Sequence, residues 1–216
     1  MSILTVGCSF TAGAELSNPA ESAWPMLIGK SNNRSVKNLG LSGASNDRTF
    51  RLVVEETAQQ RFDLVVVQWT EPSRIEIWNE HTRRLVNVNV GKMFSTMPGF
   101  EWLETYYQNH YDDFHAHKKW ATQIISLQGY LKSIDQPYVM VSLNGLDQRL
   151  YTGAWSSVKY LWDGVDTKHY PGWPFEGIYM WQGDCPRAPG GHPLELGHER
   201  IAEKINEHIR NLGWLP

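Results

Sequence analysis

Apolar residues gather in four short runs, and longer stretches of mixed polarity separate them. The runs lie at residues 2–7, 36–39, 63–69 and 137–143. The third holds Leu64-Val65-Val66-Val67, a continuous apolar segment without the polar alternation of a half-exposed strand. Such a run is typical of a parallel strand that is buried on both faces. We therefore expect a central parallel sheet that helices cover on each side.

Helical periodicity fills the stretches between these runs. Apolar residues recur with a helical period in the segments 19–29, 47–60, 101–133 and 195–211. The third segment fits one long helix or two shorter ones, and Gly213 follows the last one as a stop signal. The alternation of strand and helix predicts a three-layer α/β/α fold with a flavodoxin-like parallel sheet of about five strands.

Two segments depart from this alternation. Within residues 73–98, two stretches that alternate apolar and polar positions flank the turn Asn79-Glu80-His81-Thr82, which predicts an inserted β-hairpin. Residues 145–190 are rich in Gly, Pro, Trp and Tyr, and their apolar residues show no helical or strand period. We expect this segment to form ordered loops over the functional site that is predicted below. The whole chain, 1–216, is expected to be one domain.

Composition narrows the possible partners. The formal charge is −3 and no basic patch stands out, so neither nucleic acid nor an anionic membrane is an expected partner. Two cysteines are too few for a disulfide framework. With no run of about 18 apolar residues and no signal peptide before the first strand, the expected location is cytoplasmic. The sequence does not indicate an oligomeric state.

The turn after the first strand is the strongest candidate for chemistry. Gly7-Cys8-Ser9-Phe10-Thr11 follows an apolar run, and a strand that ends in a tight turn into a helix lifts one side chain off the sheet edge. The next backbone N–H groups then point at the same place, where they can hold an oxyanion. Ser9 is the candidate nucleophile. The alternative is that Ser9 and Thr11 only cap the next helix.

Other turns fall at the same edge of the predicted sheet. The glycine-rich segment 40–46 follows the second strand, and residues 68–74 follow the third. His192 lies in Pro189-Gly190-Gly191-His192-Pro193, just before the last helix, and could reach Ser9 as its general base.

These blocks, in this order, resemble the SGNH hydrolases, also called the GDSL-like esterase/lipase superfamily. Gly7-Cys8-Ser9-Phe10-Thr11 resembles the first block, with Cys8 in place of an Asp, and Asn38-Leu39-Gly40-Leu41-Ser42-Gly43 resembles the second. His192-Pro193 with Gly197-His198 resembles the last. The resemblance implies that Ser9 is the nucleophile, that His192 is the base, and that the Gly43 N–H contributes to the oxyanion hole.

The third and last blocks depart from the family pattern. Where the family has Gly-x-Asn-Asp, this chain has Gln68-Trp69-Thr70-Glu71, so Thr70 or Gln68 is the expected side-chain donor. The family's acid, two or three residues before the His, is replaced by Pro189 and Gly190. Asp184 is the nearest upstream carboxylate, but we favour a Ser9–His192 dyad, with a backbone carbonyl orienting the ring, over a triad with Asp184.

Several other signals favour ordinary structure. Gly7–Gly13 lacks the Lys-Ser/Thr of a phosphate loop. The cluster His110, Asp112, Asp113, His115 and His117 is more typical of a solvated helix face than of a metal site, and Cys8 of a small buried side chain. The aromatics Trp155, Trp162, Trp173 and Trp181 fit sugar stacking and core packing equally well. Asp147 and Arg149 fit a cleft or a surface ion pair.

Two functions remain open from the sequence. The first is a serine ester hydrolase, or an acyltransferase, that acts on an O-acyl ester such as an acetylated carbohydrate, with no cofactor and no metal. The second is a catalytically impaired relative that binds a glycan or a protein.

Overall fold

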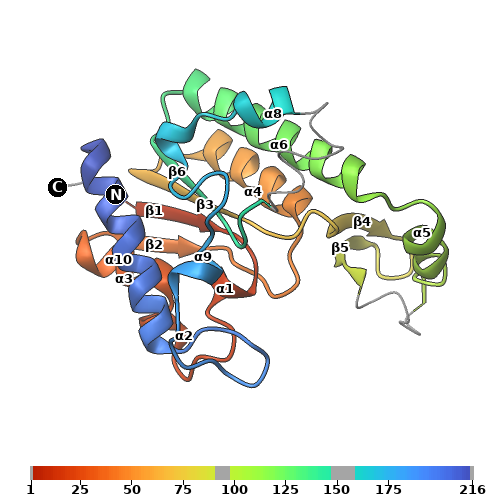
Figure 1. Cartoon of the computed structure of the whole chain (residues 1–216), viewed down its shortest axis with the longest axis horizontal. Helices are drawn as coiled ribbons and strands as arrows, with labels where there is room; N and C mark the ends of the chain where they lie inside the picture. Colours follow the sequence, from red (N-terminus) through yellow and green to blue (C-terminus); the bar gives the residue numbers. More distant parts are fainter. Residues whose placement is uncertain (1, 91–97, 147–158, 215–216) are drawn as a thin grey trace.

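The computed structural model describes residues 2–90, 98–146 and 159–214. Its centre is a sheet of four parallel strands in the order β2-β1-β3-β6, drawn in Figure 1. The strands are β1 (Ser2–Val6), β2 (Ser35–Asn38), β3 (Leu64–Trp69) and β6 (Tyr138–Ser142). The predicted α/β/α class is confirmed. All four apolar runs form strands, and the described sheet has four strands where about five were expected.

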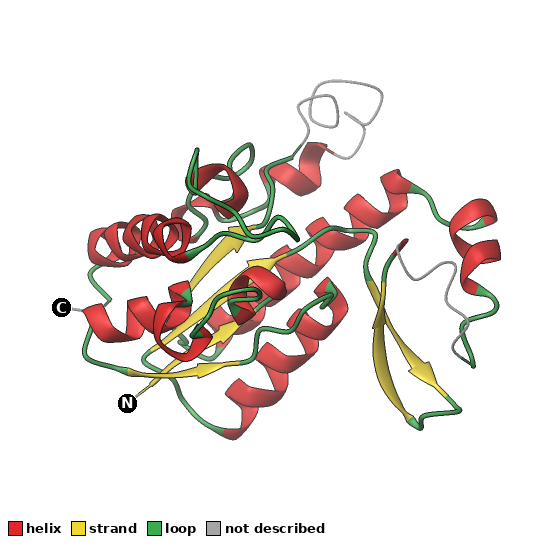
Figure 2. Cartoon of the chain, turned by 90° about the horizontal axis from the view of Figure 1, so that it is seen from below, coloured by secondary structure: helices red, strands yellow, loops and turns green. Residues whose placement is uncertain are grey.

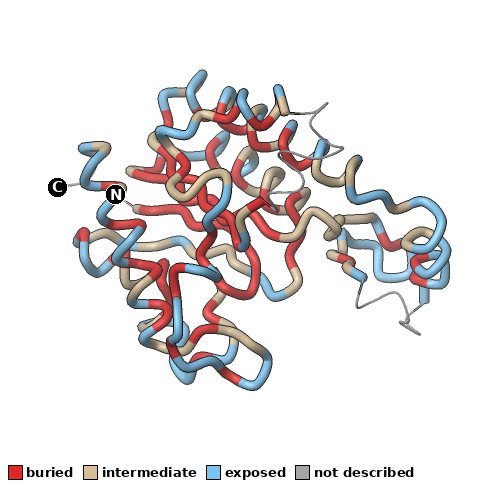
Figure 3. The backbone as a smooth tube through the Cα atoms, in the orientation of Figure 1, coloured by how far each residue is buried: buried red, intermediate tan, exposed pale blue. Residues whose placement is uncertain are grey.

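Both faces of the sheet are apolar because successive strand residues point to opposite sides. Val65 and Val67 of β3 belong to one buried cluster, and Leu64 and Val66 belong to the other. All six residues of β3 are buried, as Figure 3 shows for the centre of the fold. The first face is covered by α4 (Asn46–Gln59), α6 (Asp113–Ser133) and α8 (Lys159–Asp163), and the second by α3 (Trp24–Ser31), α9 (Ile178–Trp181) and α10 (Glu195–Leu212).

Two predicted helices differ in detail from the structure. The segment 19–29 forms α2 (Pro19–Ser22) and α3, separated at Ala23, whose backbone is extended. Pro25 lies in the first turn of α3, where its missing N–H costs nothing, and the extended Ala23 before it starts a new helix instead of continuing α2. The segment 101–133 forms α5 (Leu103–Asn109) and α6, the second of the two predicted arrangements.

The predicted hairpin insertion is confirmed. Strands β4 (Ile75–Asn79) and β5 (Arg84–Val88) pair antiparallel and stand beside the main sheet, as Figure 2 shows. A small cluster of Val88, Phe100 and Leu103 joins the hairpin to α5. The hairpin is thus a separate small layer next to the carboxyl end of the sheet, and residues 91–97 of the predicted insertion lie outside the described residues.

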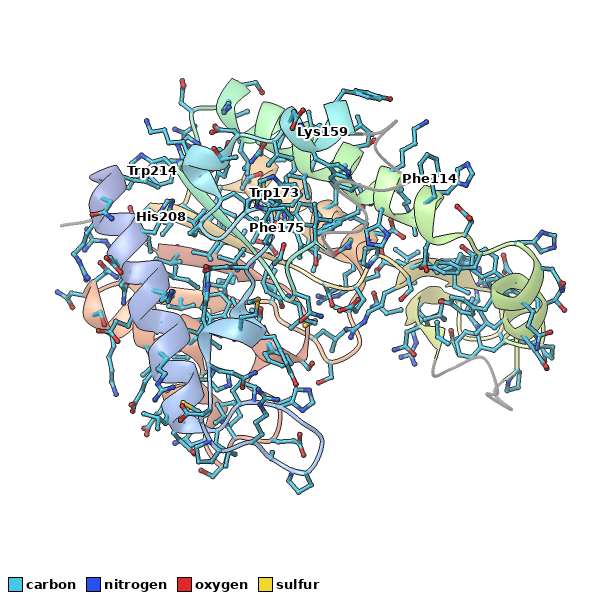
Figure 4. The ribbon with its side chains drawn as sticks, in the orientation of Figure 1. Phe114, Lys159, Trp173, Phe175, His208 and Trp214 are labelled. Carbon is cyan, nitrogen blue, oxygen red and sulfur yellow. The ribbon has the colours of Figure 1, made fainter. Side chains whose placement is uncertain are left out.

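The loop-rich region, where it is described, contributes several aromatic side chains to the core and leaves many of its other residues exposed. It carries α8, the short helix η3 (Thr167–His169) and α9. Trp162 and Trp181 are buried, and Trp173, labelled in Figure 4, lies with its ring centroid 6.0 Å from that of Trp162. Trp155, Asp147 and Arg149 lie outside the described residues. None of the described helices combines the length and the apolar character that crossing a membrane requires.

Candidate active site

Ser9 begins the short helix α1 (Ser9–Ala12), directly after β1. The N-cap is Cys8, which has extended backbone and makes no capping hydrogen bond through its side chain. Ser9 therefore does not cap this helix, and among the described residues its Oγ makes a hydrogen bond only to Cys8 Sγ, at 4.0 Å. Cys8 is fully buried, as predicted. The turn leaves Ser9 7% exposed at the carboxyl end of the sheet.

Gln68 holds this turn in place. Its Oε1 accepts hydrogen bonds from the Cys8 N–H at 2.9 Å and from the Thr11 hydroxyl at 3.0 Å. Its Nε2 donates to the carbonyl oxygen of Trp69, and the side chain is fully buried. The prediction of Gln68 as an oxyanion donor is therefore wrong, because its amide is already engaged and lies away from solvent. Gln68 instead fixes the backbone that presents Ser9.

The loop of residues 40–46, which follows β2, packs tightly on the turn that carries Ser9. A side chain at Gly40 would lie 2.4 Å from the Ala12 backbone nitrogen, so only glycine allows this approach. The Asn38 side chain donates to the Thr11 carbonyl at 2.8 Å and accepts from the Gly40 N–H at 3.0 Å. These contacts set the position of the loop that carries Gly43.

Two backbone N–H groups remain available at the site. Across the described residues, neither the Ser9 N–H nor the Gly43 N–H donates to another group of the protein. Gly43 has φ +76°, a left-handed conformation that favours glycine. Free N–H groups on two adjoining loops are the kind of donor that stabilises an oxyanion.

Thr70 does not take the place of the missing asparagine. Its backbone N–H and carbonyl are both paired with the Asn46 side chain, at 2.8 and 3.0 Å. Its Oγ1 is buried and finds no partner within the described part of the chain. A substrate oxygen cannot reach this hydroxyl in the observed arrangement, so the third block supplies no accessible side-chain donor through Gln68 or Thr70.

His192 is oriented by a carboxylate that we did not predict. Its Nδ1 lies 2.5 Å from Glu15 Oε2, and the other carboxylate oxygen accepts from the Gly190 N–H at 2.9 Å. The His192 ring centroid is 5.4 Å from that of Phe10, the neighbour of Ser9. The structure thus brings the predicted base next to the nucleophile turn. In the described residues, Ser9 Oγ and His192 do not hydrogen-bond each other; such contacts often tighten only when substrate binds.

The predicted alternatives for orienting His192 are both wrong. Asp184 pairs with Arg200 at 2.9 Å, and its side chain is 93% exposed. The Nδ1 atom meets the Glu15 carboxylate where we favoured a backbone carbonyl. Nothing in the local sequence marks Glu15, which has φ +67° in the loop after α1. It is, however, the first acidic residue of the chain, and a search for carboxylates on the nucleophile's side would have found it.

The Glu15 contact fixes the tautomer of His192. The hydrogen bond with His192, followed by that from the Gly190 N–H, lowers the pKa of Glu15. An ionised carboxylate only accepts hydrogen bonds, so His192 Nδ1 must carry the proton. The lone pair then lies on Nε2, where a general base needs it.

The second histidine of the last block has a structural role. His198 is fully buried and its Nδ1 accepts from the Trp24 N–H at 3.1 Å. Burial lowers its pKa to about 4, so the ring is neutral near pH 7. It therefore holds α10 against α3.

Comparison with models of known protein families finds no match, and no curated protein matches the sequence. Solved structures do match. The psychrotrophic esterase EstA from Pseudoalteromonas is 14% identical with a TM-score of 0.56, over 98% of this chain and 97% of that one. A lipolytic protein of the G-D-S-L family from Desulfitobacterium hafniense is 14% identical with a TM-score of 0.51, over 96% and 98%.

Carbohydrate esterases share the same architecture. A family two carbohydrate esterase from Clostridium thermocellum, in complex with cellohexaose, is 17% identical with a TM-score of 0.53, and the match covers 99% of this chain but 65% of that one. The chain thus spans about two thirds of that esterase. From these matches and the sheet order, the chain has the fold of the GDSL-like, or SGNH, hydrolases.

Proposed function

We propose that the protein is a serine ester hydrolase that acts on an O-acyl ester through Ser9, His192 and Glu15. The observation that carries the proposal is the His192–Glu15 contact beside the nucleophile turn. It supplies an acid where the sequence lacks the usual one, so the site has the chemical groups of a triad in an unusual chain order.

The reaction follows from these groups. Ser9 Oγ attacks the ester carbonyl carbon while its proton passes to His192 Nε2, and the Ser9 and Gly43 N–H groups stabilise the oxyanion. The imidazolium, held by Glu15, then protonates the leaving alcohol as the C–O bond breaks, which leaves an acyl group on Ser9. Water attacks this acyl-enzyme with His192 again as base, and the acid and free Ser9 are released.

We further propose an acetylated carbohydrate as the substrate class. Support comes from the likeness of the fold to carbohydrate esterases, one of them with cellohexaose bound. The test compares hydrolysis of acetyl, butyryl and octanoyl nitrophenyl esters, and then release of acetate from acetylated xylo-oligosaccharides. A preference for acetyl together with acetate release supports this class; a preference for octanoyl contradicts it.

Hydrolysis of nitrophenyl acetate by wild type and Ser9→Ala tests the activity itself. The matched control is Ser133→Ala, which removes an exposed hydroxyl at the end of α6 and leaves Ser9 intact. We expect loss of activity only in Ser9→Ala, and a phosphonate ester should label Ser9 alone. Equal rates in wild type and Ser9→Ala, with glycan binding intact in both, would support the binding-module alternative instead.

A further inference from the structure

The inserted hairpin of β4 and β5 contacts the loop of residues 40–46, which carries Gly43. Asn87 Oδ1, on β5, accepts from both the N–H and the hydroxyl of Ser45, each at 2.9 Å. Ser45 lies two residues after Gly43 and caps α4. The hairpin therefore packs against the loop that carries the proposed oxyanion donor.

Charged contacts hold the hairpin in this position. Arg51 of α4 pairs with both carboxylate oxygens of Glu76 on β4, at 2.8 and 2.9 Å. The Glu76 side chain is only 6% exposed. The backbone N–H of Glu76 donates to the Asp47 carboxylate at 3.1 Å. A bidentate pair between Arg51 and a nearly buried carboxylate holds the hairpin in one orientation on α4. The residues of the hairpin therefore have fixed positions relative to α4.

Asn89 lies two residues beyond Asn87, directly after the last residue of β5. Its Nδ2 is 3.8 Å from the place where a side chain on Gly43 would begin, and apart from the chain neighbours of Gly43 no other atom of the described residues comes within 4 Å of that place. Within the described part of the chain, the Asn89 amide is therefore the group that borders the space above Gly43. Among the described residues, the Asn89 side chain has no hydrogen-bond partner, so both amide N–H groups are free to donate.

We propose that Asn89 donates a hydrogen bond to the substrate carbonyl oxygen as it becomes an oxyanion, in place of an asparagine in the third block. The proposal rests on the proposed function. Gln68 and Thr70 are buried, whereas Asn89 is partly exposed and borders the space above Gly43. An amide N–H is a good donor because it develops no charge of its own and its planar group points it in one direction. The insertion thus completes the oxyanion hole from outside the main sheet.

Kinetics of Asn89→Ala and Asn89→Asp test this role, with Asn87→Ala as the comparison for a loosened hairpin. We expect Asn89→Ala to lower kcat by roughly 10²-fold with KM nearly unchanged, as for other single oxyanion donors. Asn89→Asp should lose more, since a carboxylate repels the oxyanion. An alkylboronic acid, which mimics the tetrahedral state on Ser9, should bind Asn89→Ala more weakly by a similar factor, at an unchanged unfolding midpoint.

The outcomes separate the two proposals. If Ser9→Ala is inactive while Asn89→Ala keeps the wild-type kcat and boronate affinity, the role of Asn89 is refuted and the hydrolase stands. The same conclusion holds if Asn89→Ala and Asn87→Ala raise KM and lower the unfolding midpoint alike, because that pattern reports a structural role. If Ser9→Ala hydrolyses the ester as fast as wild type, the proposed function itself fails.

Discussion

Replacement of Glu15 by Gln is the sharpest perturbation of the candidate site. Gln keeps the size of the side chain, and its oxygen can still accept from the Gly190 N–H. Its amide nitrogen then faces His192 Nδ1 as a donor. The ring must respond by carrying its proton on Nε2, the atom that has to take the proton of Ser9. The variant thus holds the ring in place and gives it the wrong tautomer.

The size of the decrease in kcat depends on how far the Glu15–His192 pair is exposed to water. Loss of a buried triad acid lowers kcat by about 10⁴-fold where the acid is shielded from water. Here the Glu15 and His192 side chains are 32% and 22% exposed, so water can replace part of the lost hydrogen bond. We therefore expect Glu15→Gln to lower kcat by roughly 10²-fold, with little change in KM.

The assay is nitrophenyl acetate hydrolysis over a range of pH. Glu21→Gln, an exposed carboxylate on α2, is the matched control and should retain full activity. Because the folded-state pKa of Glu15 is lowered, its contribution to stability is present above the ordinary value of 4.5 and is lost as pH falls through the folded value. The difference in stability between wild type and Glu15→Gln should therefore vanish in acid. A variant with wild-type kcat at pH 7 refutes the positioning role.

Three further changes test the surroundings of the site. Gln68→Ala leaves the buried Cys8 N–H without a partner, and chemical denaturation should show a loss of about 2–3 kcal/mol; a loss under about 0.5 kcal/mol means that another group holds the turn. His198, with a pKa near 4, stays neutral in the fold while the unfolded ring gains a proton below its ordinary 6.5. Stability should therefore fall by up to about 3 kcal/mol between pH 6.5 and 4, and this slope should be smaller in His198→Asn. Arg51→Met leaves the Glu76 carboxylate unpaired and should lower the unfolding free energy by about 1–3 kcal/mol and kcat as well; an unchanged kcat shows that the hairpin docks without this pair.

The sequence predicts those features whose signal lies within one short segment of the chain. The apolar segment at 64–67 can be satisfied only by burial on two faces, and β3 is buried throughout. The loops with Ser9 and Gly43 were found because they follow strands whose carboxyl ends share one edge of a parallel sheet. The helix boundaries near Pro25 and Asp112 depend on local capping and were less well placed.

The partners of these residues escaped prediction because distant segments set them. Glu15 reaches His192 only through a left-handed backbone conformation in a loop with no pattern. The burial of Thr70 depends on Asn46, and the place of Asn89 depends on how an insertion docks. A single sequence carries no local signal for such contacts, so they required the fold.

The contact between Glu15 and His192 also bears on the order of folding. It joins residues 177 positions apart, and closing a free loop of that length costs roughly 4–5 kcal/mol in chain entropy before any further constant. One partly exposed pair does not offset this cost, so the pair should form only after the sheet and α10 have already brought the two ends of the chain together. Activity regained during refolding should then follow the recovery of helical ellipticity; activity that precedes it would show an earlier meeting of the chain ends.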